Sequence, residues 1–237
     1  MKALNALHSS METYTLKREG NDYSDSSLPD NTFASATAIR KALRENNGVL
    51  SPYMPADSLL VLEQELSFNK IMYEDDMSGL LLYKLHSLQA CGYTEYLDIS
   101  TSLSDKISGQ LEKYISFPQF CNILKSKDIT HTRISRSLLH ILLNIKKDDM
   151  ELYAENGFAQ YIRILGFRED SSPLLGILKN STLPVISKLA DAEKQLNAHA
   201  NKQLSQDIFA AHVYDGIIAQ KTGRPIQNEY RRQIVIV

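Results

Sequence analysis

Residues 132–145 read TRISRSLLHILLNI, and this stretch predicts a helix that is buried on most of its surface. At 100° per residue, Arg133, Arg136 and His140 fall on one narrow polar face, which Asn144 extends. Nearly every other position is apolar: Ile134, Leu138, Leu139, Ile141, Leu142, Leu143 and Ile145. Because polar groups on a buried helix need partners, this face must meet solvent, a carboxylate or a ligand.

Further helices are expected on both sides of this one. Helical periodicity or helix-forming residues mark segments 56–67, 77–90, 104–115, 117–126, 148–155 and 185–203. The two prolines of SPYMP (51–55) mark a boundary, and the β-branched tail YRRQIVIV (230–237) favours a terminal strand. We therefore expect a mainly α chain, with an α-helical domain over residues 51–237.

The first fifty residues differ from the rest. METYTLKRE (11–19) alternates as a strand does, residues 20–31 are dense in turn formers, and residues 36–44 carry a helical period. This order predicts the last strand, loop and helix of an α/β domain over residues 1–50. A lone strand has no ladder partners, so the rest of the sheet would come from a preceding segment or from another subunit.

The segment SATAIR (35–40) opens the predicted helix with small hydroxyl residues and an arginine. Ser35 or Thr37 can cap the helix, and its first backbone N–H groups then favour an anion together with the helix dipole. Arg40 can donate a forked, charge-assisted contact to a phosphate. An ordinary cap beside a solvated arginine is the alternative, and these residues alone do not exclude it.

Composition limits the classes of partner. The net charge of the 237 residues is −2, so binding to nucleic acid or anionic lipid would require a local patch. No window approaches the length of a membrane span, and MKALNALHSS (1–10) lacks the apolar core of a signal peptide, so we expect a cytoplasmic protein. No His or Cys spacing indicates a metal site, and Cys91 and Cys121 are expected to be reduced and buried.

Five motifs occur in one order along the chain: YTLKREGNDYSD (14–25), LPDNTFASATAIRKAL (28–43), THTRISRSLLHILLNI (130–145), YIRILGF (161–167) and LPVISKL (183–189). A strand ending at Arg18, a polar loop and S-x-T-x-I-R resemble the second signature of the HIGH-type nucleotidyltransferases, which bind the phosphates of ATP on a Rossmann-like fold. The five motifs together resemble the bacterial tRNA(Met) cytidine acetate ligases over most of the chain. The resemblance is to the later part of that family's sequence, because the H-x-G-H segment does not occur here.

The resemblance implies part of an ATP-dependent ligase. In that family, acetate attacks the α-phosphate of ATP to give acetyl-adenylate and pyrophosphate, and the acetyl group passes to N4 of the wobble cytidine of elongator tRNA(Met). ATP would be a substrate, accompanied by Mg²⁺, and no protein-bound metal is implied. The residues implied in ATP binding are Arg18, Glu19, Ser35, Thr37 and Arg40. Without the H-x-G-H segment, which a preceding segment or a separate subunit would supply, this chain alone is expected to be inactive.

The resemblance also places helix 132–145 near tRNA. Arg133, Arg136 and His140, followed by Lys146 and Lys147, would contact RNA phosphates in a salt-dependent way. Few aromatic residues are interleaved with them, so backbone contacts are expected more than base stacking. Two alternatives stay open: the polar face is solvated or ion-paired, or the chain is a stand-alone helical RNA-binding module without catalysis.

Overall fold

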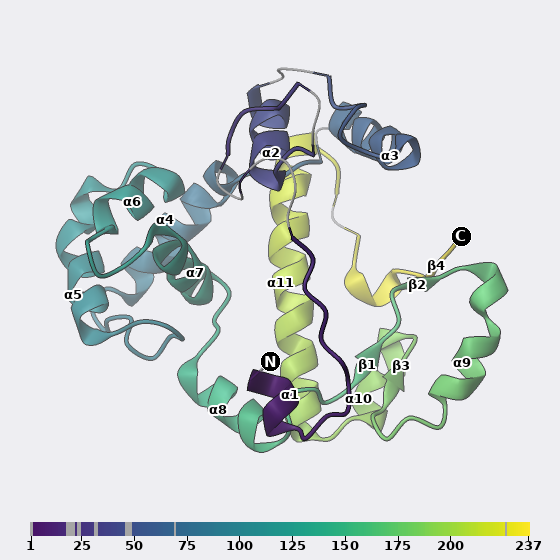
Figure 1. Cartoon of the computed structure of the whole chain (residues 1–237). Helices are drawn as coiled ribbons and strands as arrows, with labels where there is room; N and C mark the ends of the chain where they lie inside the picture. The colour runs from purple at the N-terminus through teal and green to yellow at the C-terminus, as the bar shows by residue number, and fades with distance from the viewer. Residues whose placement is uncertain are drawn as a thin grey trace. The chain divides into compact units, whose positions relative to one another are not determined.

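The computed structural model of the chain describes residues 2–17, 22, 25–30, 33–45, 49–68, 70–225 and 227–237. These residues form two compact units, Met1–Ser67 and Phe68–Val237. Helices dominate and the strands are few and short (Figure 1), so the expectation of a mainly α chain is confirmed. The first unit ends later than the predicted domain boundary at residue 50, because it includes helix α3, Ala56–Ser67.

The first unit contains α1 (Lys2–Ala6), α2 (Ala36–Glu45) and α3. Ala38 and Ala42 of α2 are buried, one helical turn apart, and they define the inward face of that helix. Helices α2 and α3 were both expected from the sequence, at 36–44 and 56–67.

The strand predicted at residues 11–19 is wrong for residues 11–17, which the structure describes as irregular chain. Tyr14 and Leu16, which alternation places on one side, are 85% and 96% exposed. Alternation and β-branched residues favour a strand only where a neighbouring strand accepts its hydrogen bonds, and these seven residues pair with no described segment. The description of residues 1–50 as the end of a Rossmann-like domain is therefore not supported by a strand here.

The second unit begins with a layer of helices around one hydrophobic core. Its elements are η1 (Glu74–Met77), α4 (Ser78–Leu88), α5 (Thr101–Gln110), η2 (Leu111–Lys113), α6 (Phe117–Leu124), α7 (His131–Leu142) and α8 (Lys147–Glu155). Side chains of Ser100, Ser116 and Thr130 accept backbone N–H bonds at the starts of α5, α6 and α7. Fully buried Leu81, Phe120, Ile134 and Leu138 join α4, α6 and α7 in this first core.

The two cysteines differ from each other. Cys121 lies in the first core, and burial raises the pKa of its thiol to about 12. Cys91 is exposed, so the expectation that both thiols are buried is wrong for Cys91.

Helix α7 ends three residues earlier than the predicted 145. Asn144 adopts the left-handed region with φ 57°, its N–H bonds to the carbonyl of Ile141, and the N–H of Ile145 bonds to the carbonyl of His140. This is the hydrogen-bond pattern of a Schellman stop, for which asparagine is one of the few suitable residues. Asn144 is therefore the end of α7 and not a continuation of its polar face.

The remainder of the second unit contains two short parallel ladders. Strand β1 (Ile162–Arg163) pairs with β3 (Val185–Ile186), and β2 (Gly166–Phe167) pairs with β4 (Val235–Ile236). The intervening helices are η3 (Glu169–Ser171), α9 (Pro173–Leu178), η4 (Leu189–Asp191), α10 (Ala192–Gln195), α11 (Ala198–Thr222) and η5 (Glu229–Arg231). Gly166 is required for the second ladder, because a Cβ there would lie 2.8 Å from the carbonyl oxygen of Val235.

Helix α11 contributes buried side chains to two cores. Ala200, Leu204 and Ile208, spaced four residues apart, pack in a second core with residues of β3, η4 and α10. Ile217, further along the same helix, is buried in the first core. The helix predicted at 185–203 is wrong in its first part, where a strand and two short helices occur, and α11 continues well beyond its predicted end.

We expect Ile217→Ala to lower the free energy of unfolding by about 2–5 kcal/mol, because it leaves a cavity where α11 meets the first core. Urea denaturation followed by circular dichroism measures this loss. Ile218→Ala is the matched control. Because Ile218 is only half-buried, its replacement should lower the free energy of unfolding by less. Equal losses for the two variants would contradict the role assigned to Ile217.

Candidate functional site

The N-terminus of α2 carries three of the predicted ATP-binding residues. The side chain of Ser35 accepts a hydrogen bond from the backbone N–H of Ala38 at 2.9 Å, which is the geometry of a helix cap. Its hydroxyl also donates to the carbonyl oxygen of Asp25 at 2.5 Å, and Ser35 is fully buried. Ser35 therefore fixes the start of α2 and joins it to the preceding loop.

Thr37 and Arg40 are more accessible than Ser35. Thr37 is half-buried and Arg40 is exposed, both on the first turns of α2. The remaining two predicted ATP-binding residues, Arg18 and Glu19, lie outside the described residues. Among the described residues near this helix start, Arg40 is a cation that is exposed to solvent.

A cavity of about 290 Å³ in the same unit lies along the side of α2. It is lined by Ser26, Ser27 and Leu28 of the loop and by Ala38, Lys41, Ala42 and Glu45 of α2. Ser35, Thr37 and Arg40 do not line it. The cavity and the predicted phosphate contacts are therefore different parts of the α2 surface.

The polar face of α7 meets the segment 94–99 of the same unit. The Nε of Arg136 donates to Oδ2 of Asp98 at 2.7 Å, and Ser137 donates to the carbonyl oxygen of Asp98 at 3.3 Å. His140, only 9% exposed, places its Nδ1 3.0 Å from the carbonyl oxygen of Leu97. Arg136 is therefore ion-paired, as one of the two alternatives for the polar face expected, and His140 contacts a backbone carbonyl.

The lysines after α7 hold the same segment. Lys146 pairs with Oε2 of Glu95 at 3.0 Å, and Lys147 donates from Nζ to the carbonyl oxygens of Thr94 at 2.6 Å and Ile99 at 2.8 Å. Backbone bonds join 95–97 to 145–147 as well. Four of the five predicted tRNA contacts are thus brought together, and each already binds segment 94–99.

Arg133 differs from those four. It is exposed on the first turn of α7, and its guanidinium makes no hydrogen bond or ion pair with any residue that the structure describes. The side chains that the sequence analysis missed are Asp98 and Glu95. Their signal is weak in sequence, because they lie 38 residues from Arg136 and 51 residues from Lys146 in a loop without period.

Among the described residues, no group of three or more His, Cys, Asp or Glu side chains lies together as a metal ion would need. Within those same residues, no helix combines the length and apolar character needed to cross a bilayer.

Comparison with known families gives one match over most of the chain. A family model described as HIGH Nucleotidyl Transferase matches residues 1–229. The tRNA(Met) cytidine acetate ligase of Caldanaerobacter subterraneus subsp. tengcongensis is 33% identical over 217 residues, which cover 90% of this chain and 52% of the relative. The protein of the same name from Bacillus subtilis is 30% identical over 228 residues, covering 94% and 52%. The chain spans about half the length of the curated relatives that it matches.

Solved structures show the same architecture. Thermotoga maritima TmcAL in its apo form I superposes with a TM-score of 0.88 at 23% identity, over 99% of this chain and 58% of that one. The form of the same protein bound with alpha-thio ATP gives a TM-score of 0.81 at 22% identity, over 99% and 56%. At these identities the likeness establishes a shared fold.

We expect Lys147→Met to lower the free energy of unfolding by about 1–3 kcal/mol, because two carbonyl oxygens lose a charged donor. Arg133→Met should change it by less than about 0.5 kcal/mol, since that side chain is exposed and holds nothing in place. Urea denaturation compares the two variants. A large loss of unfolding free energy for Arg133→Met would contradict the solvent-facing role of Arg133. No loss for Lys147→Met would contradict the structural role of Lys147.

Proposed function

Because the chain belongs to the HIGH nucleotidyl transferase family, we propose that it is part of an ATP-dependent tRNA(Met) cytidine acetate ligase. The observation that carries the proposal is the family match over residues 1–229, together with the name shared by relatives at 30–35% identity. The reaction would activate acetate as acetyl-adenylate and acetylate N4 of the wobble cytidine of elongator tRNA(Met). Such a protein acts in the cytoplasm, where tRNA is found.

ATP is the proposed substrate at the start of α2, accompanied by Mg²⁺. A structural neighbour bound with alpha-thio ATP supports this choice of nucleotide. Adenylation develops negative charge on the α-phosphate and on departing pyrophosphate, so it needs fixed donors and cations more than a protein nucleophile. Arg40 and Thr37 would contact phosphate, Ser35 would position the helix start by its cap, and Arg18 with Glu19 would complete the site.

The polar face of α7 is the proposed tRNA contact. Arg133 is the side chain best suited to meet a phosphate, because it is exposed and holds no described partner. Arg136, His140, Lys146 and Lys147 would contribute positive potential while they hold segment 94–99 in place. The contacts would be to the RNA backbone.

Acetate-dependent release of pyrophosphate from ATP tests the proposal. We expect activity when this chain is joined behind the N-terminal half of the Bacillus subtilis relative, which would supply the H-x-G-H segment, and none from this chain alone. In the joined protein, Arg40→Ala should lower the rate about a hundredfold, since it removes a charged donor from the transition state. Lys41→Ala, an exposed neighbour on α2, is the control and should stay active. A folded joined protein without acetate-dependent release would contradict the proposal.

Binding of tRNA to this chain is a second test. We expect Arg133→Ala to weaken binding and to reduce the slope of log affinity against log salt by about one, as for loss of one phosphate contact. Lys194→Ala also removes one exposed positive charge, on α10, and should leave the slope nearly unchanged. Filter binding over a range of salt concentrations measures both. If Arg133→Ala and the unchanged chain gave the same slope of log affinity against log salt, Arg133 would not contact RNA phosphate.

The burial of Ser35 favours a second candidate, a helical module that binds RNA without using ATP. The hydroxyl of Ser35 already accepts a hydrogen bond from the N–H of Ala38 and donates one to the carbonyl oxygen of Asp25. An ordinary helix cap requires no more than this. Under this candidate the chain binds tRNA, and the joined protein releases no pyrophosphate. The two tests above therefore separate the candidates.

A further inference from the structure

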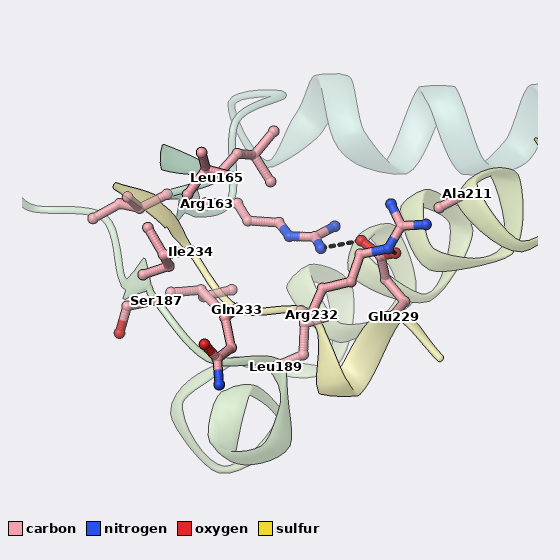
Figure 2. Close-up of a pocket in the computed structure, with 12 residues that line it drawn as sticks. Arg163, Leu165, Ser187, Leu189, Ala211, Glu229, Arg232, Gln233 and Ile234 are labelled. Carbon is pink, nitrogen blue, oxygen red and sulfur yellow. Dashed lines mark hydrogen bonds and ion pairs between the residues drawn. The ribbon is translucent and has the colours of Figure 1, made fainter. Parts of the chain in front are cut away.

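Two cavities of the second unit differ in how the charges of their lining side chains are neutralised. One cavity, of about 410 Å³, is lined by residues of β1, β3, η4, α11, η5 and β4. Figure 2 shows Arg163 bonded to Glu229 at this cavity, with Arg232 beside the same carboxylate. Oε1 of Glu229 accepts a hydrogen bond from Arg163 at 2.5 Å, and Oε2 lies 3.1 Å from Nε of Arg232. Arg232 also donates to Asp215 at 2.5 Å, so two arginines and two carboxylates neutralise one another here.

The other cavity, of about 220 Å³, lies between the segment that follows α7, helix α8 and helix α11. Leu143, Ile145 and Met150 supply apolar walls, and Tyr153 and Phe158 supply aromatic rings. The polar part of the lining comes from α11. The volume is below the range of sites for drug-sized ligands, so the cavity suits a group about as large as one amino-acid side chain.

Asp207 lines this second cavity from α11, and no described cation neutralises its carboxylate. Its Oδ2 accepts a hydrogen bond from the hydroxyl of Tyr161, which is a neutral partner. Asp149 on α8 differs, because Lys202 pairs with its Oδ1 and Gln206 donates to its Oδ2 at 2.8 Å. Within the described part of the chain, the cavity therefore carries one negative charge that has no ion-pair partner.

Tyr153 is fixed at the same cavity by its hydroxyl, which donates to Oε1 of Gln206 at 2.8 Å. Burial, together with the charges of Asp149 and Asp207, raises the pKa of this tyrosine to about 12. The two carboxylates therefore make the electrostatic potential at the ring negative.

Phe158 is held in the lining at a conformational cost. Its φ is 58°, in the left-handed region that bulky side chains rarely adopt, and the residue is 58% exposed. Its N–H bonds to the carbonyl of Tyr153 at 2.6 Å, and its own carbonyl accepts a hydrogen bond from Gln203 at 3.1 Å. Because burial of the ring gives little in return for this backbone strain, the strain is better explained by a ligand that the ring contacts.

We propose that this cavity binds a primary ammonium group on a short alkyl chain, with the ammonium at Asp207 and the methylene groups against the apolar walls. A carboxylate attracts such a cation, and the faces of aromatic rings add to the attraction. A metal ion needs several ligands, whereas the described residues bring no three His, Cys, Asp or Glu side chains together. The inference goes beyond the proposed function and does not depend on it, since the described lining includes no proposed ATP or tRNA contact.

Titration of the full chain with three small probes, followed by NMR of the backbone amides, tests the proposal. The probes n-butylammonium, n-butanol and butyrate each have four carbons and differ in charge, so the contribution of apolar burial nearly cancels. We expect n-butylammonium to bind with a dissociation constant of roughly 1 mM at about 0.15 M salt, and about tenfold more tightly than the other two. Equal affinities for the three probes, or no saturable binding of n-butylammonium, would overturn the proposal.

The same ammonium group can belong to a free amine or to a lysine side chain of another protein. Nα-acetyl-lysine N-methylamide carries that side chain with a peptide group on each side. An affinity equal to that of n-butylammonium would support the site with protein lysine as its source. A weaker affinity, beside intact binding of n-butylammonium, would support the site with a free amine as its source.

Three variants assign the preference for n-butylammonium to this cavity. Asp207→Asn removes the charge but keeps an acceptor for the hydroxyl of Tyr161, so the preference over n-butanol should fall below about twofold. Ala210→Phe places a ring in the cavity and should abolish binding of n-butylammonium. Asp105→Asn also removes an exposed carboxylate, on α5 and outside the lining, and should keep the full preference. A preference that survives in folded Asp207→Asn would overturn the assignment.

Discussion

Helix α11 carries side chains of two separate hydrophobic cores on one continuous hydrogen-bonded backbone. Ala200, Leu204 and Ile208 serve the second core, and Ile217 serves the first. An α-helix rises 1.5 Å per residue, so the 25 residues of α11 span about 37 Å. The hydrogen bonds within the helix make it resist bending. Asn197 caps its start and Gly223, with φ 67°, ends it. The second unit therefore has two cores whose spacing is set by one rigid element.

Most of the basic residues around α7 have partners within the same unit. Arg136, His140, Lys146 and Lys147 each hold the segment 94–99, which itself has little secondary structure. Their charge is partly balanced by Asp98 and Glu95, so the electrostatic field toward a polyanion is weaker than the count of cations suggests. Arg133, at the start of α7, lacks such compensation among the described residues. Among the described residues, the positive charge of this surface is therefore least compensated at this end of the helix.

Periodicity predicted the helices that have a clear apolar face. It failed where tertiary contacts determine the secondary structure. Helices α2, α3, α6 and α8 were expected within one or two residues of their observed bounds. The part of α11 beyond residue 203 was missed, because its alanine, glutamine and other polar residues leave it almost no apolar stripe. The β1–β3 and β2–β4 ladders are two residues long, too short for any alternation to appear. For the candidate site, the cations are visible in the sequence, whereas the distant carboxylates that pair with Arg136 and Lys146 have no local signal.

Strand β4 is joined to β2 by only two residue pairs, across a glycine that lets the two backbones approach closely. Few backbone hydrogen bonds must break for β4 to detach, and neither core loses a buried side chain when it does. The second ladder is therefore expected to open before either core does.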